Sequence, residues 1–113
     1  RVTHKSTITD LIDVDLRVGI IEEAIPFPEA RVPAYKLKIN FGPSGFRQTS
    51  AQLTRRYQPE DLIGRKIVAA LGLPPLRVAG FKSECLVLGS VDGEGDVILL
   101  HPNEDALVGW PIR

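Results

Sequence analysis

Strict alternation between apolar and polar side chains marks the stretch Tyr35-Lys36-Leu37-Lys38-Ile39-Asn40-Phe41. Successive side chains of a β-strand point to opposite faces of its sheet, so a period of two residues indicates a strand with one buried face. The stretch therefore predicts a strand whose apolar side chains enter a core, while Lys36, Lys38 and Asn40 face outward.

Shorter segments of the same kind lie on both sides of this strand, separated by turns rich in proline and glycine. We predict further strands over residues 16–24, 46–53, 66–71, 83–91 and 97–101, the last two joined across a turn at 93–95, and a short helix over 54–62. Gly19, inside the first of these strands, could mark the sharp bend that a small barrel needs. About five strands with a helix between the third and fourth predict an all-β oligonucleotide/oligosaccharide-binding (OB) barrel, although this pattern alone also fits another small barrel.

The strand over residues 46–53 has two candidate registers. Pairing of Phe41 with Phe46 would turn Gln48 and Ser50 into the barrel, which costs free energy unless these polar groups find partners. A bulge near Gly45 would instead turn the alternate set inward, because a shift of one residue reverses the faces of a strand. We favour the bulge, and the inward set is then Thr49, Ala51 and Leu53.

The N-terminal region departs from the β pattern. Ile8, Leu11 and Ile12 are spaced i, i+3 and i+4, which predicts a short amphipathic helix over residues 7–13, with a neighbouring serine or threonine as its cap. Residues 1–113 contain no linker or repeat, so we expect a single domain.

Composition limits the classes of function. Lys and Arg number 14 and Asp and Glu also number 14, so the net charge is zero and any basic surface must come from uneven distribution. The chain has no apolar run of about 18 residues, so we expect no membrane insertion. Cys85 is the one cysteine and cannot form an internal disulfide, which favours a reducing cytoplasm.

Signatures of catalysis are weak. The only histidines are His4 and His101, and with the single thiol of Cys85 they do not form a metal-ligand set. No glycine-rich segment both follows a strand and opens a helix, as a phosphate-binding loop does. We therefore predict a protein that is not an enzyme, with no catalytic residue, metal or cofactor.

Features suited to binding are more frequent. Several cations lie in predicted loops or beside an aromatic ring, as a surface for phosphates and bases requires. These cations are Arg31, Arg55, Arg56, Arg77 and Lys82. Phe81, an apolar ring between Gly80 and Lys82, is either a plug of the core or an exposed contact.

Two motifs connect the chain to a known family. The stretch Leu73-Pro74-Pro75-Leu76-Arg77-Val78-Ala79-Gly80-Phe81-Lys82-Ser83-Glu84 and the strand entry Asp15-Leu16-Arg17-Val18-Gly19 resemble motifs of the tRNA-binding domain family. This resemblance covers the span from Asp13 to the C-terminus. It implies an OB barrel with an N-terminal helix.

Longer blocks resemble one branch of that family, the export-related CsaA-type chaperones. These blocks are residues 27–34, 49–57, 79–84 and 95–100. The branch implies a homodimer that binds unfolded or export-bound polypeptides. By similarity, the dimer interface would include Ile8, Leu11, Ile12 and the tail 108–112 with Trp110.

The resemblance also suggests roles at the ligand site. Many tRNA-binding members have Asn-Leu where this chain has Gly72-Leu73, and Gly-Met where it has Cys85-Leu86. Because of these two departures, the tRNA-contacting role carries over only to the matching residues between them, Lys82, Ser83 and Glu84. Two hypotheses follow. In the first, the chain is a chaperone with Phe81 as a polypeptide contact; in the second, it is primarily a structure-specific tRNA-binding protein or synthetase accessory factor.

Overall fold

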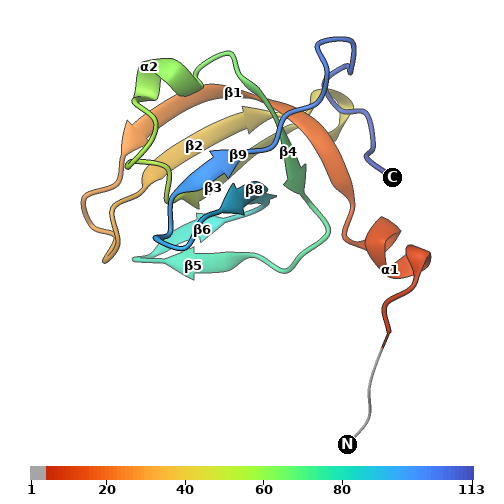
Figure 1. Ribbon diagram of the computed structural model, residues 1–113, viewed down its shortest axis with the longest axis horizontal. Helices are drawn as coiled ribbons and strands as arrows, with labels where there is room; N and C mark the ends of the chain where they lie inside the picture. The colour runs from red at the N-terminus through yellow and green to blue at the C-terminus, as the bar shows by residue number, and fades with distance from the viewer. Residues whose placement is uncertain (1–4) are drawn as a thin grey trace, which may run out of the picture.

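The computed structural model describes residues 5–113, and His4 lies outside them (Figure 1). Most of the regular structure is β. In chain order the elements are α1 (Ile8–Asp13), β1 (Leu16–Pro26), β2 (Tyr35–Asn40), the 3₁₀ turn η1 (Gly42–Ser44), β3 (Phe46–Ala51), α2 (Pro59–Leu62), β4 (Lys66–Ala70), β5 (Leu76–Val78), β6 (Phe81–Ser83), β7 (Leu86–Val87), β8 (Gly89–Val91) and β9 (Val97–Leu99).

Five of the strands form one antiparallel sheet in the order β3-β2-β1-β4-β7. The two ends of this sheet approach each other. The backbone N–H of Glu84 donates to the carbonyl of Gln48 (2.8 Å), and the Thr49 hydroxyl donates to the carbonyl of Cys85 (2.6 Å). These bonds bring the segment before β7 against β3, so the sheet is a nearly closed barrel and the predicted OB fold is confirmed.

The apolar side chains of the alternating stretch 35–41 lie in the barrel interior. Tyr35, Leu37, Ile39 and Phe41 are all buried, and Lys38 is exposed. Gly19 of β1 lies beneath this layer. A Cβ atom there would come within 2.6 Å of the Phe41 ring and 2.7 Å of the Ile39 side chain, so glycine lets β1 and β2 approach closely.

The favoured register of β3 is confirmed. Asn40 pairs with Phe46 and Leu37 with Thr49, which places Thr49 inside the barrel at 1% exposure. The shift comes from the η1 turn and from Gly45, whose φ of 84° is in the left-handed region. The 3₁₀ turn and Gly45 therefore set the register of β3 that we expected a bulge to set.

Three details differ from the sequence predictions. The helix predicted over 54–62 is only the four residues of α2, because Pro59 can begin a helix but disfavours helical backbone at the residue before it. The strand predicted over 83–91 is divided among β6, β7 and β8, which pair with β5, β4 and β9 respectively. Strand β5 was not predicted at all.

The N-terminal helix forms as expected from its apolar spacing. Thr7 caps α1 through its side-chain oxygen, which accepts the N–H of Asp10, and the Asp10 carboxylate accepts the N–H of Thr7 in return. In Figure 1 this helix stands away from the barrel. Among the described residues, no helix has the length and apolar character needed to cross a membrane.

Candidate functional site

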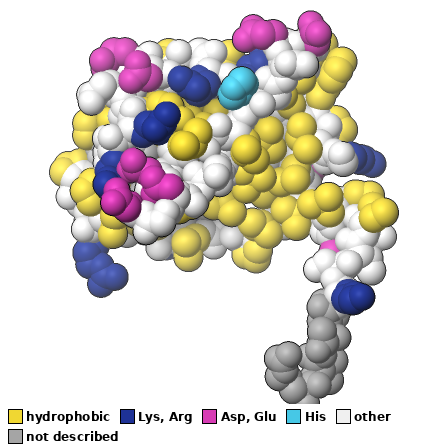
Figure 2. Space-filling view, in the orientation of Figure 1, with side chains coloured by type: hydrophobic (Ala, Val, Ile, Leu, Met, Phe, Trp, Pro, Cys, Tyr) yellow, Lys and Arg dark blue, Asp and Glu magenta, His cyan; other side chains and the backbone are white. Residues whose placement is uncertain are grey.

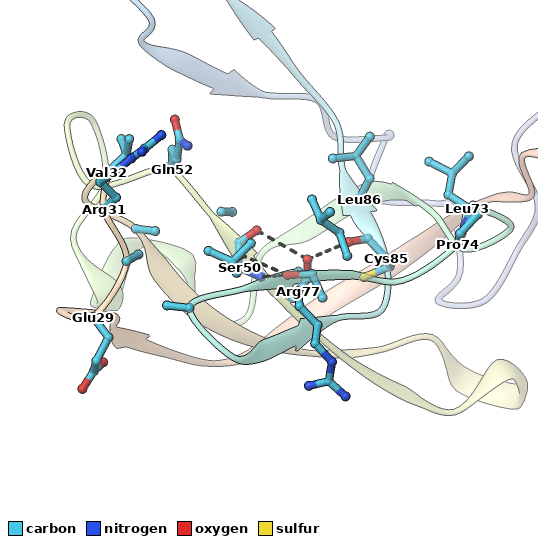
Figure 3. Close-up of a pocket in the computed structure, with 18 residues that line it drawn as sticks. Glu29, Arg31, Val32, Ser50, Gln52, Leu73, Pro74, Arg77, Cys85 and Leu86 are labelled. Carbon is cyan, nitrogen blue, oxygen red and sulfur yellow. Dashed lines mark hydrogen bonds between the residues drawn. The ribbon is translucent and has the colours of Figure 1, made fainter.

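A groove of about 680 Å³ opens between the loop 27–34, strand β3 and the β5–β6 hairpin (Figure 3). The loop 27–34 joins the first two barrel strands, and the hairpin is part of the connection between β4 and β7. OB barrels bind ligands on the face of their second and third strands, between these two connections. The groove lies along the third strand of this face and between the two connections, while β2 contributes no residue to its lining.

The lining of the groove is largely apolar. Eleven of its 18 lining residues carry apolar side chains, and among these Val32, Leu73, Leu76 and Leu86 are exposed to solvent. Leu76 is 66% exposed, and it lies with the other exposed apolar side chains along one groove, an arrangement that is typical of a binding surface. Arg31 and Arg77 supply positive charge at the same groove.

The β5–β6 hairpin carries two of the predicted cations on one face. Its two-residue turn places Ala79 (φ 47°) and Gly80 (φ 80°) in the left-handed conformation, as a type I′ turn requires. Arg77 and Lys82 are directly paired across the strands, so both cations project from one face. A guanidinium N–H of Arg77 also donates to the Gly80 carbonyl (3.1 Å), which holds it near the turn.

The predicted ligand contacts Ser83 and Glu84 are engaged with β3. The Ser83 oxygen accepts the backbone N–H of Ser50 (3.1 Å), and Ser83 is buried. The Glu84 carboxylate accepts the backbone N–H of Gln48 (3.0 Å), whose side-chain amide donates to the Lys82 carbonyl (2.9 Å). In this structure these groups attach the hairpin to the barrel, and of the predicted motif Lys82 has the exposed side chain.

Phe81 fastens the same hairpin to the loop 27–34. Its ring meets the buried ring of Phe27 edge-on, with centroids 5.5 Å apart. The ammonium of Lys36 lies 4.6 Å from the Phe27 centroid and 5.0 Å from the Phe81 centroid. Phe81 is half-buried and is not among the residues that line the groove, so its role as a polypeptide contact stays a prediction.

The predicted cations do not all gather at the groove. Arg31 and Arg77 line it, and Lys82 is beside Arg77. Arg55 instead pairs with Asp96 (3.0 Å) and donates to the carbonyl of Glu94 (2.6 Å) in the β8–β9 turn. Arg56 is exposed and is not among the residues that line the groove.

Sequence reasoning missed a second hollow, of about 350 Å³, on the outer face of β2 and β3. Lys36, Lys38, Phe46, Arg47 and Phe81 are among its lining residues, and Phe46 is 52% exposed. The outward positions of Lys36 and Lys38 were visible in the alternation of β2. Phe81, more than 40 positions further along the chain, lines the same hollow because of the β5–β6 hairpin, which the sequence did not reveal.

Cys85 lines the groove but is a poor nucleophile. Burial raises the pKa of its thiol to about 12, and the nearby Arg47 guanidinium offsets only part of this effect. Within residues 5–113, no three His, Cys, Asp or Glu side chains are grouped as metal ligands would be.

A separate apolar surface carries the residues predicted at a dimer interface. Ile8 (80%), Leu11, Ile12 and Trp110 (53%) are all exposed. Figure 2 shows hydrophobic side chains gathered on the barrel face between the C-terminal segment and α1. An exposed apolar area of this kind on a small protein indicates an interaction surface.

Comparison with known proteins agrees with the fold. Residues 16–111 match the family model described as "Putative tRNA binding domain". Two methionine–tRNA ligases, from Methanocaldococcus jannaschii and Bdellovibrio bacteriovorus, are 35% and 34% identical over 94% and 92% of this chain. The chain spans only 16% and 15% of the length of these two ligases.

Two solved structures match over the whole length of their chains. The chaperone CsaA from Bacillus anthracis is 53% identical with a TM-score of 0.91, covering 97% of this chain and 100% of that one. The CsaA chaperone protein from Picrophilus torridus is 44% identical with a TM-score of 0.87, covering 96% and 100%. With the match to the family model over nearly the whole barrel, these findings show that the chain belongs to the tRNA-binding domain family.

Proposed function

We propose that the chain is a non-catalytic, cytoplasmic chaperone of the CsaA type, which binds extended segments of unfolded or export-bound polypeptides in the groove. The apolar lining of the groove is the observation that carries this proposal. Unfolded chains expose apolar side chains, and burying these against Val32, Leu76 and Leu86 would remove apolar surface from water on both partners. The two similar CsaA structures support the same reading.

The groove is also suited to an extended chain. It is bounded by β3 on one side and by a hairpin held in place by the Phe27–Phe81 contact on the other. A preformed groove costs less ordering free energy on binding than a surface that must first assemble. The hydroxyl of Ser50, which is only partly buried, lies within it and can orient a polar group of a bound backbone.

The test is suppression of the aggregation of an unfolded protein, together with the binding of a labelled unfolded polypeptide. Leu76→Ser and Leu86→Ser should weaken both, because each removes exposed apolar surface from the groove. Ile63→Ser is the matched control, since Ile63 is 54% exposed and lies outside the groove. Equal activity in all three variants would contradict the proposal.

A second candidate function is tRNA binding, favoured by the Arg77–Lys82 pair on the hairpin. With Arg31 at the same groove, these cations form a basic rim (Arg31, Arg77, Lys82) that suits phosphates. In this role the chain would be primarily a tRNA-binding protein or a synthetase accessory factor. The family match and the ligase relatives support this candidate.

We further propose that the protein is a homodimer. The apolar surface formed by Ile8, Leu11, Ile12 and Trp110 supports this assembly, because it lies outside the groove and is otherwise exposed. A dimer joined there would leave both grooves open, so two sites could hold one long polypeptide or RNA with increased avidity.

A further inference from the structure

The edge of β3 that faces away from β2 is covered over only part of its length. The backbone N–H of Glu84 donates to the carbonyl of Gln48 on this edge (2.8 Å). Two residues further along, the backbone N–H of Ser50 donates to the Ser83 oxygen (3.1 Å). Alternate residues of a strand direct their backbone groups to the same side, so Gln52 continues this edge just beyond the end of β3. The hairpin segment therefore covers the edge only as far as the Ser50 N–H.

Two backbone groups that follow on the same edge lack a strong partner. Within residues 5–113, the N–H of Gln52 makes no hydrogen bond. The Ser50 carbonyl lies 3.4 Å from the Thr49 hydroxyl, but this hydroxyl has a single proton, which it donates to the Cys85 carbonyl at 2.6 Å. Ser50 and Gln52 both line the groove (Figure 3). The groove therefore contains a short stretch of open strand edge beside its apolar side chains.

The direction of these two groups follows from the pairing of β3 with β2. Ala51 pairs with Tyr35 of β2, and its own N–H and carbonyl point toward that strand. Every described peptide bond is trans, and the C=O and N–H of a trans peptide unit point to opposite sides. The Ser50 carbonyl and the Gln52 N–H each share a peptide unit with Ala51, so both point away from β2. An extended chain beside them can donate one hydrogen bond to Ser50 and accept one from Gln52.

We propose that a polypeptide binds in the groove as an added β-strand, with its backbone paired to Ser50 and Gln52 and every second side chain packed on the apolar lining. This inference rests on the proposed polypeptide-binding function and adds the mode of binding. An unpaired strand edge is a template for another chain. In strand addition the main chain supplies affinity, and contacts to alternate side chains supply selectivity. Val32, Leu76 and Leu86 offer those apolar contacts.

This mode of binding selects a segment by the pattern of its residues. Side chains two residues apart in a strand lie on the same face, about 6–7 Å apart. A segment with apolar side chains at every second position can therefore pack on the groove while its backbone stays paired. Proline has no N–H to donate, so it is excluded at the position that pairs with the Ser50 carbonyl. Many unrelated unfolded chains contain such segments, and each is a ligand.

Fluorescence anisotropy with short labelled peptides tests the proposal. One peptide carries two leucines separated by a single residue in a run of serine and threonine, and a second peptide of the same composition separates them by two residues. The first should bind severalfold more tightly, because both of its leucines face the groove. Replacing one amide of this peptide at a time with an ester removes an N–H without adding bulk. Successive N–H groups point to opposite sides, so affinity should fall about tenfold at one position and little at its two neighbours.

The reciprocal change in the protein is Gln52→Pro, which deletes the N–H that donates to the peptide. The Leu53 N–H donates to the Ala51 carbonyl (3.0 Å), and the φ of Gln52 is not positive. Gln52 is therefore the centre of an inverse γ-turn, for which φ is about −75°. Proline holds φ at about −65°, so the substitution fits this backbone. Gln52→Pro should bind the first peptide about tenfold more weakly, whereas Gln52→Ala, which keeps the N–H, should lose much less affinity.

The contrary results separate the mode of binding from the function. If no ester weakens binding and Gln52→Pro binds like Gln52→Ala, strand addition is overturned, while weaker binding by Leu76→Ser and Leu86→Ser would keep the groove as the polypeptide site. Equal affinity for the two leucine spacings also overturns strand addition. If the unaltered protein binds neither the peptides nor an unfolded polypeptide, the function is overturned with it. Should circular dichroism show that Gln52→Pro does not fold, the ester series on the unaltered protein decides.

Discussion

The hydroxyl groups of Ser50 and Ser83 lie 3.0 Å apart, and this contact joins β3 to β6 inside the groove. The Ser83 oxygen accepts the Ser50 backbone N–H as well. The family resemblance predicts a ligand contact at Ser83, and this role stays a prediction. In the structure the hydrogen bonds of Ser83 attach the hairpin that carries Arg77 and Lys82. The position of the hairpin cations and the closure of the barrel therefore depend on the same side chain.

Replacing Ser83 with alanine should destabilise the protein. The variant leaves the Ser50 N–H and hydroxyl without their partner in a poorly solvated place, which costs about 1–3 kcal/mol. Denaturant unfolding measures the change, with Ser90→Ala on the exposed part of β8 as control. Unchanged stability with reduced RNA affinity would show that Ser83 acts through the ligand alone.

The sequence predicted the barrel because its strands alternate over enough residues to define a buried face, as 35–41 does. It did not predict β5, because Leu76-Arg77-Val78 is a strand only through its pairing with β6 across the left-handed turn at Ala79-Gly80. The second hollow, on the outer face of β2 and β3, was invisible for the same reason. Phe46 and Phe81 are brought to one hollow by strand register and by that hairpin, which are properties of long-range pairing.

The close approach of β1 and β2 at Gly19 predicts a stability effect. Gly19→Ala would place a Cβ atom 2.6 Å from the Phe41 ring, and overpacking of this kind costs about 1–3 kcal/mol. Thermal or denaturant unfolding should show this loss. Gly93→Ala is the control, since an added Cβ there meets nothing within 4 Å. Similar stability of the two variants would contradict the packing argument.

The Cys85 thiol predicts a dependence of stability on alkaline pH. Burial raises its pKa from 9.0 to about 12, so the unfolded chain loses this proton before the folded one does. The stabilising contribution is complete below pH 9 and is lost as the pH rises toward 12. The difference in unfolding free energy between the unaltered protein and Cys85→Ala should therefore decrease over that interval.

If the difference in unfolding free energy between these two proteins does not change with pH, folding does not raise the pKa of the Cys85 thiol. Alkylation by iodoacetamide gives an independent measurement. Cys85 should react slowly at pH 8 in the folded protein and quickly in denaturant, because the thiolate is the reacting form.

The basic rim predicts how RNA binding responds to salt. Arg77→Ala/Lys82→Ala removes two phosphate contacts and should reduce the slope of log affinity against log salt by about 2. Arg55→Ala should change this slope less, because Arg55 is already paired with Asp96. Titrations at several salt concentrations measure both slopes. Equal changes would place Arg55 in the RNA interface despite its ion pair.

The apolar surface around α1 predicts the assembly state. Trp110→Glu, or Ile12→Glu on α1, would place a charge in the proposed dimer interface, where it loses hydration without gaining a partner. Light scattering should then give the mass of a monomer at micromolar concentration, against a dimer for the unaltered protein. Ile63→Glu, at a position as exposed as Trp110 and outside that surface, should remain dimeric.

Since each groove lies within one chain, the monomeric variants should keep their affinity for a short polypeptide and lose avidity only for long ones. A monomer for the unaltered protein would overturn the assembly while leaving the groove intact.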